Sequence, residues 1–126
     1  METSEFLASI KTTPANSAEW GEIFWLVGAE EMPGAEQTFG VVKILPGKRN
    51  PLHAHPNCEE LLYVVSGKCE HKLGDEFFNL KAGDVIRIPR GMKHWARCTS
   101  DEELLAIISF SSADRRVESF EGDSVA

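Results

Sequence analysis

The amino-acid sequence predicts one all-β domain with the two packed sheets of a jelly roll. Short runs rich in Val, Ile, Leu and aromatic residues alternate with breaks made of Gly, Pro, Asn and Asp, which is the pattern of strands joined by turns. None of these runs carries a sustained helical period. The chain has 126 residues, of which 42% are apolar, and this is enough for one domain with a packed core.

Seven runs are expected to form strands: residues 22–27, 38–45, 61–65, 68–73, 76–80, 85–88 and 104–110. Gly74 and Asp75 separate two of these runs and predict a tight hairpin. Residues 61–65 and 104–108 are apolar at consecutive positions, so both faces of these strands are apolar. One face can line the interior, and the other needs a second sheet or a second subunit as a cover. We therefore expect a homodimer.

The two ends of the chain differ from the part between them. Residues 1–18 are expected to form a short N-terminal arm, residues 19–112 the barrel, and residues 113–126 a polar C-terminal tail. The tail contains Arg115 and Arg116 followed by acidic residues, and we expect it to be poorly ordered beyond Phe120.

Composition excludes several classes of partner. The formal net charge is -7, which argues against binding to nucleic acid and to an anionic membrane surface. No run approaches the ~20 apolar residues of a membrane-spanning helix, and residues 1–10 lack the features of a secretory signal. The cysteines, at positions 58, 69 and 98, form neither a disulfide framework nor a metal or redox motif. We expect a cytoplasmic protein with reduced thiols and a small-molecule substrate or ligand.

Three histidines and a glutamate are the candidate site. His53 and His55 are two residues apart, so on a strand their side chains point the same way. Glu60 begins the next apolar run, and His94 follows a Pro-x-Gly turn far along the chain. Three imidazoles and a carboxylate suit one divalent transition-metal ion such as Fe, Mn, Ni or Zn, with positions left open for a substrate.

The wider sequence around these residues resembles the cupin superfamily. Residues 47–67 are similar to its first motif, G-x5-H-x-H-x4-E-x6-G, and residues 83–98 to its second, G-x5-P-x-G-x2-H-x3-N, with Cys98 in the place of the final Asn. The resemblance covers roughly residues 38–110 and implies a double-stranded β-helix (jelly-roll) barrel. It also implies that the metal ligands are His53, His55, Glu60 and His94.

Other residues have a structural and a functional interpretation. Glu59 is an alternative ligand, but strand alternation puts it on the opposite face from Glu60 and favours a surface acid. His71 is either a proton shuttle at the pocket rim or a packed core histidine, and the second is favoured. Cys98 is expected to be a small core residue. Cations that could hold a substrate carboxylate are Lys43, Lys48, Arg49, Arg87, Arg90 and Lys93. For each of them a solvated surface charge is favoured, and Arg87 is the best functional candidate of the group. Aromatic residues that could line a pocket, an interface or the core are Trp25, Tyr63 and Trp95.

The resemblance implies a metal-dependent protein without fixing its reaction. We expect an enzyme that acts on a small polar organic substrate, and the ligand set favours a dioxygenase of the quercetin dioxygenase-like group. In the Lewis-acid alternative, an isomerase or lyase acting on a sugar or sugar acid, Glu60 or a metal-bound hydroxide moves the proton. A non-catalytic cupin that binds a small molecule is the other alternative.

Overall fold

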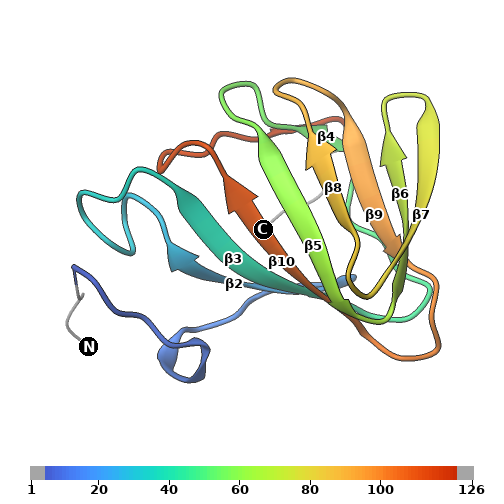
Figure 1. Ribbon diagram of the computed structural model, residues 1–126, viewed down its shortest axis with the longest axis horizontal. Coiled ribbons are helices and arrows are strands. Elements are labelled where there is room, and N and C mark those ends of the chain that lie inside the picture. The colour runs from blue at the N-terminus through green and yellow to red at the C-terminus, as the bar shows by residue number, and fades with distance from the viewer. Residues whose placement is uncertain (1–4, 122–126) are drawn as a thin grey trace.

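The computed structural model describes residues 5–121, which fold into two antiparallel sheets joined by turns and loops (Figure 1). The six-stranded sheet has the order β1-β2-β3-β10-β5-β8. Its strands are β1 (Asn16–Ala18), β2 (Gly21–Val27), β3 (Thr38–Ile44), β10 (Leu104–Phe110), β5 (Glu60–Ser66) and β8 (Val85–Ile88). The five-stranded sheet has the order β11-β4-β9-β6-β7. Its strands are β11 (Glu118–Ser119), β4 (His53–Ala54), β9 (His94–Cys98), β6 (Lys68–Leu73) and β7 (Glu76–Lys81).

The helical content of the described residues is a single 3-10 turn, η1 (Ile10–Thr12), in which the backbone amide group of Lys11 donates to the side chain of Ser9. The all-β prediction is confirmed. None of the helical segments in residues 5–121 has the length and apolar character needed to cross a lipid bilayer.

All seven predicted runs are strands, and their ends differ from the prediction by at most one residue. Four strands were not predicted. Three of them, β1, β4 and β11, have only two or three residues, too few for an alternating pattern. The fourth, β9, buries His94, Ala96 and Cys98 in alternation, but a histidine, an alanine and a cysteine do not read as the apolar face of a strand.

The core lies between the two sheets and follows from strand alternation. In β5 the side chains of Glu60, Leu62 and Val64 are buried, and those of the residues between them are exposed. Ile44 and Leu104, on β3 and β10, are wholly buried. Burial of each such side chain stabilises the fold by roughly 1.5–3 kcal/mol. The core prediction for the apolar runs is therefore confirmed.

The outer faces of both sheets retain exposed apolar side chains. These are Leu61, Tyr63, Val65 and Val85 on the six-stranded sheet and Phe77 on the five-stranded sheet. The burial pattern agrees with strands that are apolar on both faces. The homodimer that would cover them stays a prediction.

Two turns depend on glycine. Gly74 has φ +59° and closes the tight hairpin between β6 and β7, which confirms the hairpin predicted there. Gly67 has φ +85°, and a Cβ atom at this position would lie 3.1 Å from the carbonyl oxygen of Glu103. A side chain would thus disturb the connection between β5 and β6.

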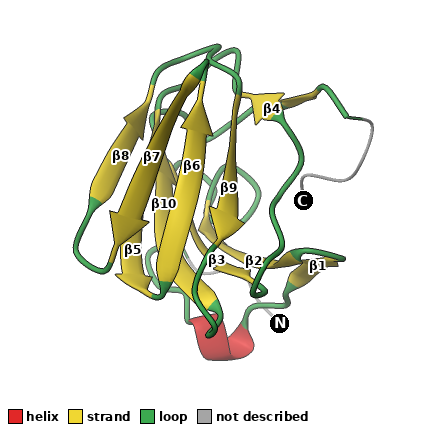
Figure 2. Cartoon of the chain, turned by 90° about the vertical axis from the view of Figure 1, so that its right-hand side faces the viewer, coloured by secondary structure: helices red, strands yellow, loops and turns green. Residues whose placement is uncertain are grey.

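Both ends of the described chain add short strands to the sheets (Figure 2). β1 pairs with β2, and β11 pairs with β4 through Glu118 opposite Ala54. Arg49 forms a two-bond ion pair with Glu121, at 2.9 and 3.0 Å.

The division into residues 1–18, 19–112 and 113–126 stays a prediction. The predicted loss of order beyond Phe120 concerns mainly residues 122–126, which lie outside the described residues.

Candidate metal centre

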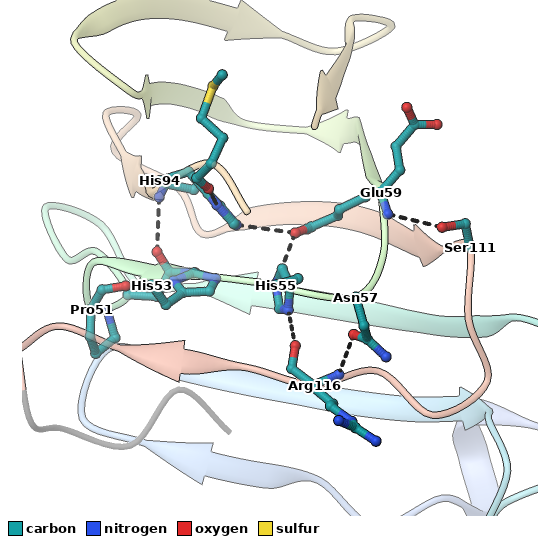
Figure 3. Close-up of polar contacts among 12 residues, drawn as sticks. Pro51, His53, His55, Asn57, Glu59, His94, Ser111 and Arg116 are labelled. Carbon is teal, nitrogen blue, oxygen red and sulfur yellow. Dashed lines mark hydrogen bonds and ion pairs between the residues drawn. The ribbon is translucent and has the colours of Figure 1, made fainter. Parts of the chain in front are cut away.

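Four buried side chains from both sheets converge at one end of the molecule. His53 lies on β4 directly opposite His94 on β9, and His55 follows β4 by one residue. Glu60 begins β5 in the other sheet. One ligand atom from each side chain lies within 4.8 Å of the others. The three histidines point toward one another in Figure 3, so the predicted constellation is assembled in space.

Backbone carbonyl groups fix the orientation of all three imidazoles. The Nδ1 atom of His53 donates to the carbonyl oxygen of Pro51 at 2.6 Å, that of His94 to Met92 at 2.9 Å, and that of His55 to Arg116 at 2.9 Å (Figure 3). Because a carbonyl oxygen only accepts, each Nδ1 carries its proton. The Nε2 atoms are left to face the common centre, as they do when imidazoles ligate a metal.

The carboxylate of Glu60 lies between two of these imidazoles. Its Oε1 atom is 3.2 Å from Nε2 of His94 and 3.3 Å from Nε2 of His55. Burial raises the pKa of Glu60, but the two imidazoles outweigh burial and hold this pKa far below its usual range. Burial also lowers the pKa of His94, and the carboxylate more than reverses that effect. Glu60 is therefore ionised.

The donor set fits a cation at the centre. The Nε2 atom of His55 is buried and has no hydrogen-bond partner among the described residues, although a carboxylate oxygen is near it. Burial, followed by the charge of His94, lowers the pKa of His53 to about 3, so this ring is neutral and presents a lone pair. The lone pair of this ring and the ionised carboxylate of Glu60 repel each other unless a positive charge is shared between them. The site is compatible with one metal ion.

A small cavity of about 30 Å³ adjoins these side chains. Its wall is mostly apolar and comes from β2, β3, β5 and β10, with Ile44, Leu62, Ile108 and Phe110 among its residues. This volume has room for about two water molecules. Polar groups in the wall other than the candidate ligands are Asn50 and Arg115. Trp25 lines the cavity and also packs against the core, so the pocket and core interpretations both apply to it.

Arg115 is the residue that the sequence analysis missed. It belongs to the segment after β10, which was interpreted as a polar tail and has no strand or helix period. Two adjacent arginines in the sequence do not indicate that one side chain faces the cavity, as Arg115 does, while the other, Arg116, is exposed. The side chain of Arg115 reaches the cavity only because its segment packs next to β4.

Arg87, the best functional candidate among the cations, is a solvated surface charge, which is the interpretation favoured for each of them, and its alternative as a ligand for a substrate carboxylate is wrong. Its side chain is 64% exposed and forms an ion pair with Glu59 at 2.9 Å. Strand alternation puts both side chains on the outside, because Arg87 lies opposite Leu61, whose side chain also faces outward. Glu59 is the surface acid that alternation favoured. None of the other predicted cations lines the cavity.

Those cations have partners elsewhere. Lys48 pairs with Glu19 and Arg49 with Glu121, whereas Lys43 and Lys93 lie over the rings of Phe24 and Phe120. The remaining cation, Arg90, is outside the cavity wall. Tyr63 is 43% exposed on the outer face, and Trp95 packs edge-on against Phe77, so neither lines the cavity.

Cys98 is a core residue, as expected. Its side chain is 1% exposed, and its thiol donates to the carbonyl oxygen of Glu102 at 3.2 Å. The contact ties down the turn between β9 and β10.

His71 is packed behind the site and not at the cavity rim. Its ring stacks on that of His94 with 5.7 Å between centroids, and its Nδ1 atom has no hydrogen-bond partner among the described residues. Burial, followed by the charge of His94, lowers the pKa of His71 to about 4. The packed-core interpretation is confirmed, and the rim location required of a shuttle is wrong.

The neutrality of buried His71 predicts acid sensitivity of the metal-free protein. Between pH 6.5 and about 4 the unfolded chain binds a proton at this residue and the folded chain does not, so stability falls as pH falls. Over this range His71 lowers the free energy of unfolding by about 1.4 kcal/mol for each unit by which the pH falls. Urea unfolding at pH 7, 6, 5 and 4.5 should show a steeper loss for the wild type than for His71→Leu. Parallel pH curves for the two proteins would contradict the prediction.

Comparisons with known proteins add a family and related folds. A family model described as "Cupin domain" matches residues 40–110. The chain is 30% identical over 105 residues to "Polyketide synthase CurC" of Streptomyces cyaneus, a match that covers 83% of this chain and 68% of that protein. It is also 30% identical over 122 residues to "Oxalate oxidase 1" of Hordeum vulgare, with 86% and 60% of the two chains covered.

Solved structures resemble the fold closely. A structure of Bacillus subtilis oxalate decarboxylase, studied for its Mn(II) centres, superposes with a TM-score of 0.82 at 25% identity. This match covers 88% of the present chain and 31% of that enzyme. The likeness confirms the predicted jelly-roll barrel. The chain spans less than a third of that decarboxylase and 60% of the oxalate oxidase.

Proposed function

This chain belongs to the cupin family, and we propose that it is a metal-dependent enzyme acting on a small organic acid. In this proposal His53, His55, Glu60 and His94 hold one divalent transition-metal ion. The observation that carries the proposal is the convergence of their four buried ligand atoms within 4.8 Å, with each imidazole oriented by a backbone carbonyl group. This arrangement of ligands and supporting hydrogen bonds is typical of metal centres in proteins.

Manganese and iron are the ions we propose first. The related B. subtilis oxalate decarboxylase has Mn(II) centres, and three nitrogen donors with one oxygen donor suit both ions. A bound divalent ion would supply a positive charge that polarises a substrate oxygen or, for a redox-active ion, an electron. Nickel and zinc stay alternatives, because the ligand types alone do not separate them.

The residues of the chain have distinct tasks in this proposal. The carbonyl groups of Pro51, Met92 and Arg116 hold the three imidazole rings in their orientations. Glu60 offsets part of the charge of the ion, and as an ionised carboxylate it can also accept a substrate proton. Because its pKa is low, Glu60 is a weak base, and its main task in this proposal is to bind the metal ion. The apolar wall excludes water from the reacting atoms.

The cavity favours a small acid over a sugar. A cavity of about 30 Å³ has room for only a few non-hydrogen atoms, so the smallest acids come nearest to its size and a sugar ring exceeds it most. The hydroxyl groups of a sugar would also need several hydrogen-bond partners, and an apolar wall leaves them unpaired at about 1–3 kcal/mol each. Relatives named as an oxalate oxidase and an oxalate decarboxylase support this choice. The reaction is then an oxidation or a decarboxylation, with the dioxygenase as the oxygen-dependent form of the same proposal.

Metal content and turnover test the proposal together. Protein purified without chelators is expected to contain about one transition-metal ion per chain, and His53→Ala is expected to lose it. The loaded protein is then supplied with oxalate and other short carboxylic acids while oxygen uptake and carbon dioxide release are recorded. Oxygen uptake identifies an oxidase or dioxygenase, and carbon dioxide release without oxygen uptake identifies a decarboxylase. A chain that takes up no ion even after reconstitution would refute the enzyme proposal and leave the non-catalytic binding protein.

A further inference from the structure

We propose that Arg115 is the residue that selects the substrate, by binding the carboxylate of a small organic acid in the cavity beside the metal centre. The inference rests on the proposed function and names the substrate class and the side chain that recognises it. Arg115 lines the same cavity as His53, His55 and Glu60. Among the described residues of the cavity wall it is the only arginine or lysine.

The guanidinium group of Arg115 is held by aromatic rings. Its Cζ atom lies 4.2 Å from the ring centroid of Trp25 and 5.4 Å from that of Phe110, and both rings also line the cavity. Stacking on ring faces holds the planar group without using its N–H donors. The donors therefore stay available for another group.

No carboxylate pairs with this guanidinium within residues 5–121. Glu60 and Glu31 are near enough to attract it, but neither forms an ion pair with it, whereas neighbouring Arg116 pairs with Asp114. A partly buried cation without a hydrogen-bonding anion loses hydration without compensation. Arginine donates two parallel hydrogen bonds to a carboxylate, which would satisfy its donors.

The backbone around Arg115 is fixed by the metal centre itself. The carbonyl oxygen of Arg116 accepts from His55, and the amide group of Arg116 donates to the side chain of Asn57 at 3.0 Å. The Asn57 side chain in turn donates to the carbonyl oxygen of Asp114 at 2.8 Å. Arg115 lies between these two anchored residues. Its distance from the candidate ligands is thus set by hydrogen bonds to one of the ligands and to a loop next to it.

Arg115 and Trp25 also form the boundary with a larger outer depression. The depression has a volume of about 340 Å³ and is lined by Glu30, Glu31 and Asp114 as well as by Arg115 and Trp25. Within its described lining Arg115 is again the only cation. A small acid that reaches the depression meets one positive group, at the boundary with the cavity. A divalent ion only partly offset by Glu60 would draw the same anion inward.

The test compares an acid with its neutral isostere. Acetate and acetamide are titrated calorimetrically into the wild type, Arg115→Met, Arg115→Lys and Arg87→Met, each with and without Mn(II). Arg87→Met is the matched control, because it removes a guanidinium from the outer face of the six-stranded sheet, where the side chain is 64% exposed. We expect Arg115→Met to weaken acetate binding by about 10- to 100-fold and to leave acetamide binding unchanged. Arg87→Met should bind both probes as the wild type does.

Arg115→Lys protects the test against a folding defect. It keeps the charge but loses the two-bond contact, so its acetate affinity should lie between those of the wild type and Arg115→Met. Equal acetate affinity in the wild type and Arg115→Met, or a wild type that binds acetate no better than acetamide, would overturn the proposal. Elemental analysis of each variant separates this outcome from failure of the metal site. If the wild type takes up no metal, the titrations without Mn(II) still decide the role of Arg115.

Discussion

Replacing Glu60 with glutamine is expected to weaken metal binding by more than about 100-fold, because loss of a partner that merely supports a ligand already costs 10- to 100-fold. The amide keeps the shape of the side chain and removes the charge that offsets the ion. Its NH₂ group also points donors at the Nε2 atoms of His55 and His94 and can occupy the lone pairs meant for the metal. Metal content after dialysis against a weak chelator measures the effect.

Glu59→Gln is the matched control for this substitution. It makes the same chemical change one residue earlier in the chain, but Glu59 is exposed and pairs with Arg87 on the outer face. An exposed ion pair of this kind contributes about 0–1 kcal/mol to stability, so metal content should stay at the wild-type level. If Glu59→Gln lost the ion and Glu60→Gln kept it, the assignment of the ligand carboxylate would be wrong.

Removal of the metal ion is expected to lower the melting temperature by roughly 10 °C. Free ion at 100 times its dissociation constant stabilises the folded state by about 2.7 kcal/mol. For a domain of 126 residues, each kcal/mol moves the melting temperature by roughly 3–5 °C. The physical reason is local: without an ion, the folded state confines four ligand atoms in a space of 4.8 Å, and the unfolded state releases them.

Differential scanning calorimetry with Mn(II) and with a chelator measures this shift. Glu60→Gln should show no comparable response to Mn(II), which separates binding at the site from weak binding to the acidic surface. A wild type that carries one ion per chain and melts at the same temperature after chelation would contradict the prediction. An ion that binds the folded state more tightly than the unfolded state must raise the melting temperature.

The strands of the barrel could be predicted because their signal is local. Side chains along a strand point to alternate faces, so the strand predicted at residues 61–65 already indicates which of its residues share a face. The same geometry puts Glu60 and Glu59 on opposite faces. The weak strands had no such signal. β4 has two residues, His53 and Ala54, and it is a strand because β9 and β11 pair with it. Pairing between distant segments leaves little trace in so short a stretch.

The site shows the same division. His-x-His spacing, the carboxylate at the start of a strand and the histidine after a Pro-x-Gly turn are local features, and their resemblance to the cupin motifs named all four side chains that converge. The pocket alternative for Arg87 stayed open because a cation in an apolar strand is compatible with either face, and only the pairing of β5 with β8 puts it outside, next to Glu59. Arg115 was missed because its segment has no period.

The sequence alone determined the alternating strands and the residue types and spacing of the candidate ligands, since both follow from neighbours a few residues apart. The tertiary structure decided which distant groups share the cavity. His53 meets His94 through the pairing of β4 with β9, and Arg115 reaches the cavity because the segment after β10 is hydrogen-bonded to His55 and Asn57. These contacts join residues about 40 to 60 positions apart. They depend on how the two sheets pack, which no local pattern in the sequence specifies.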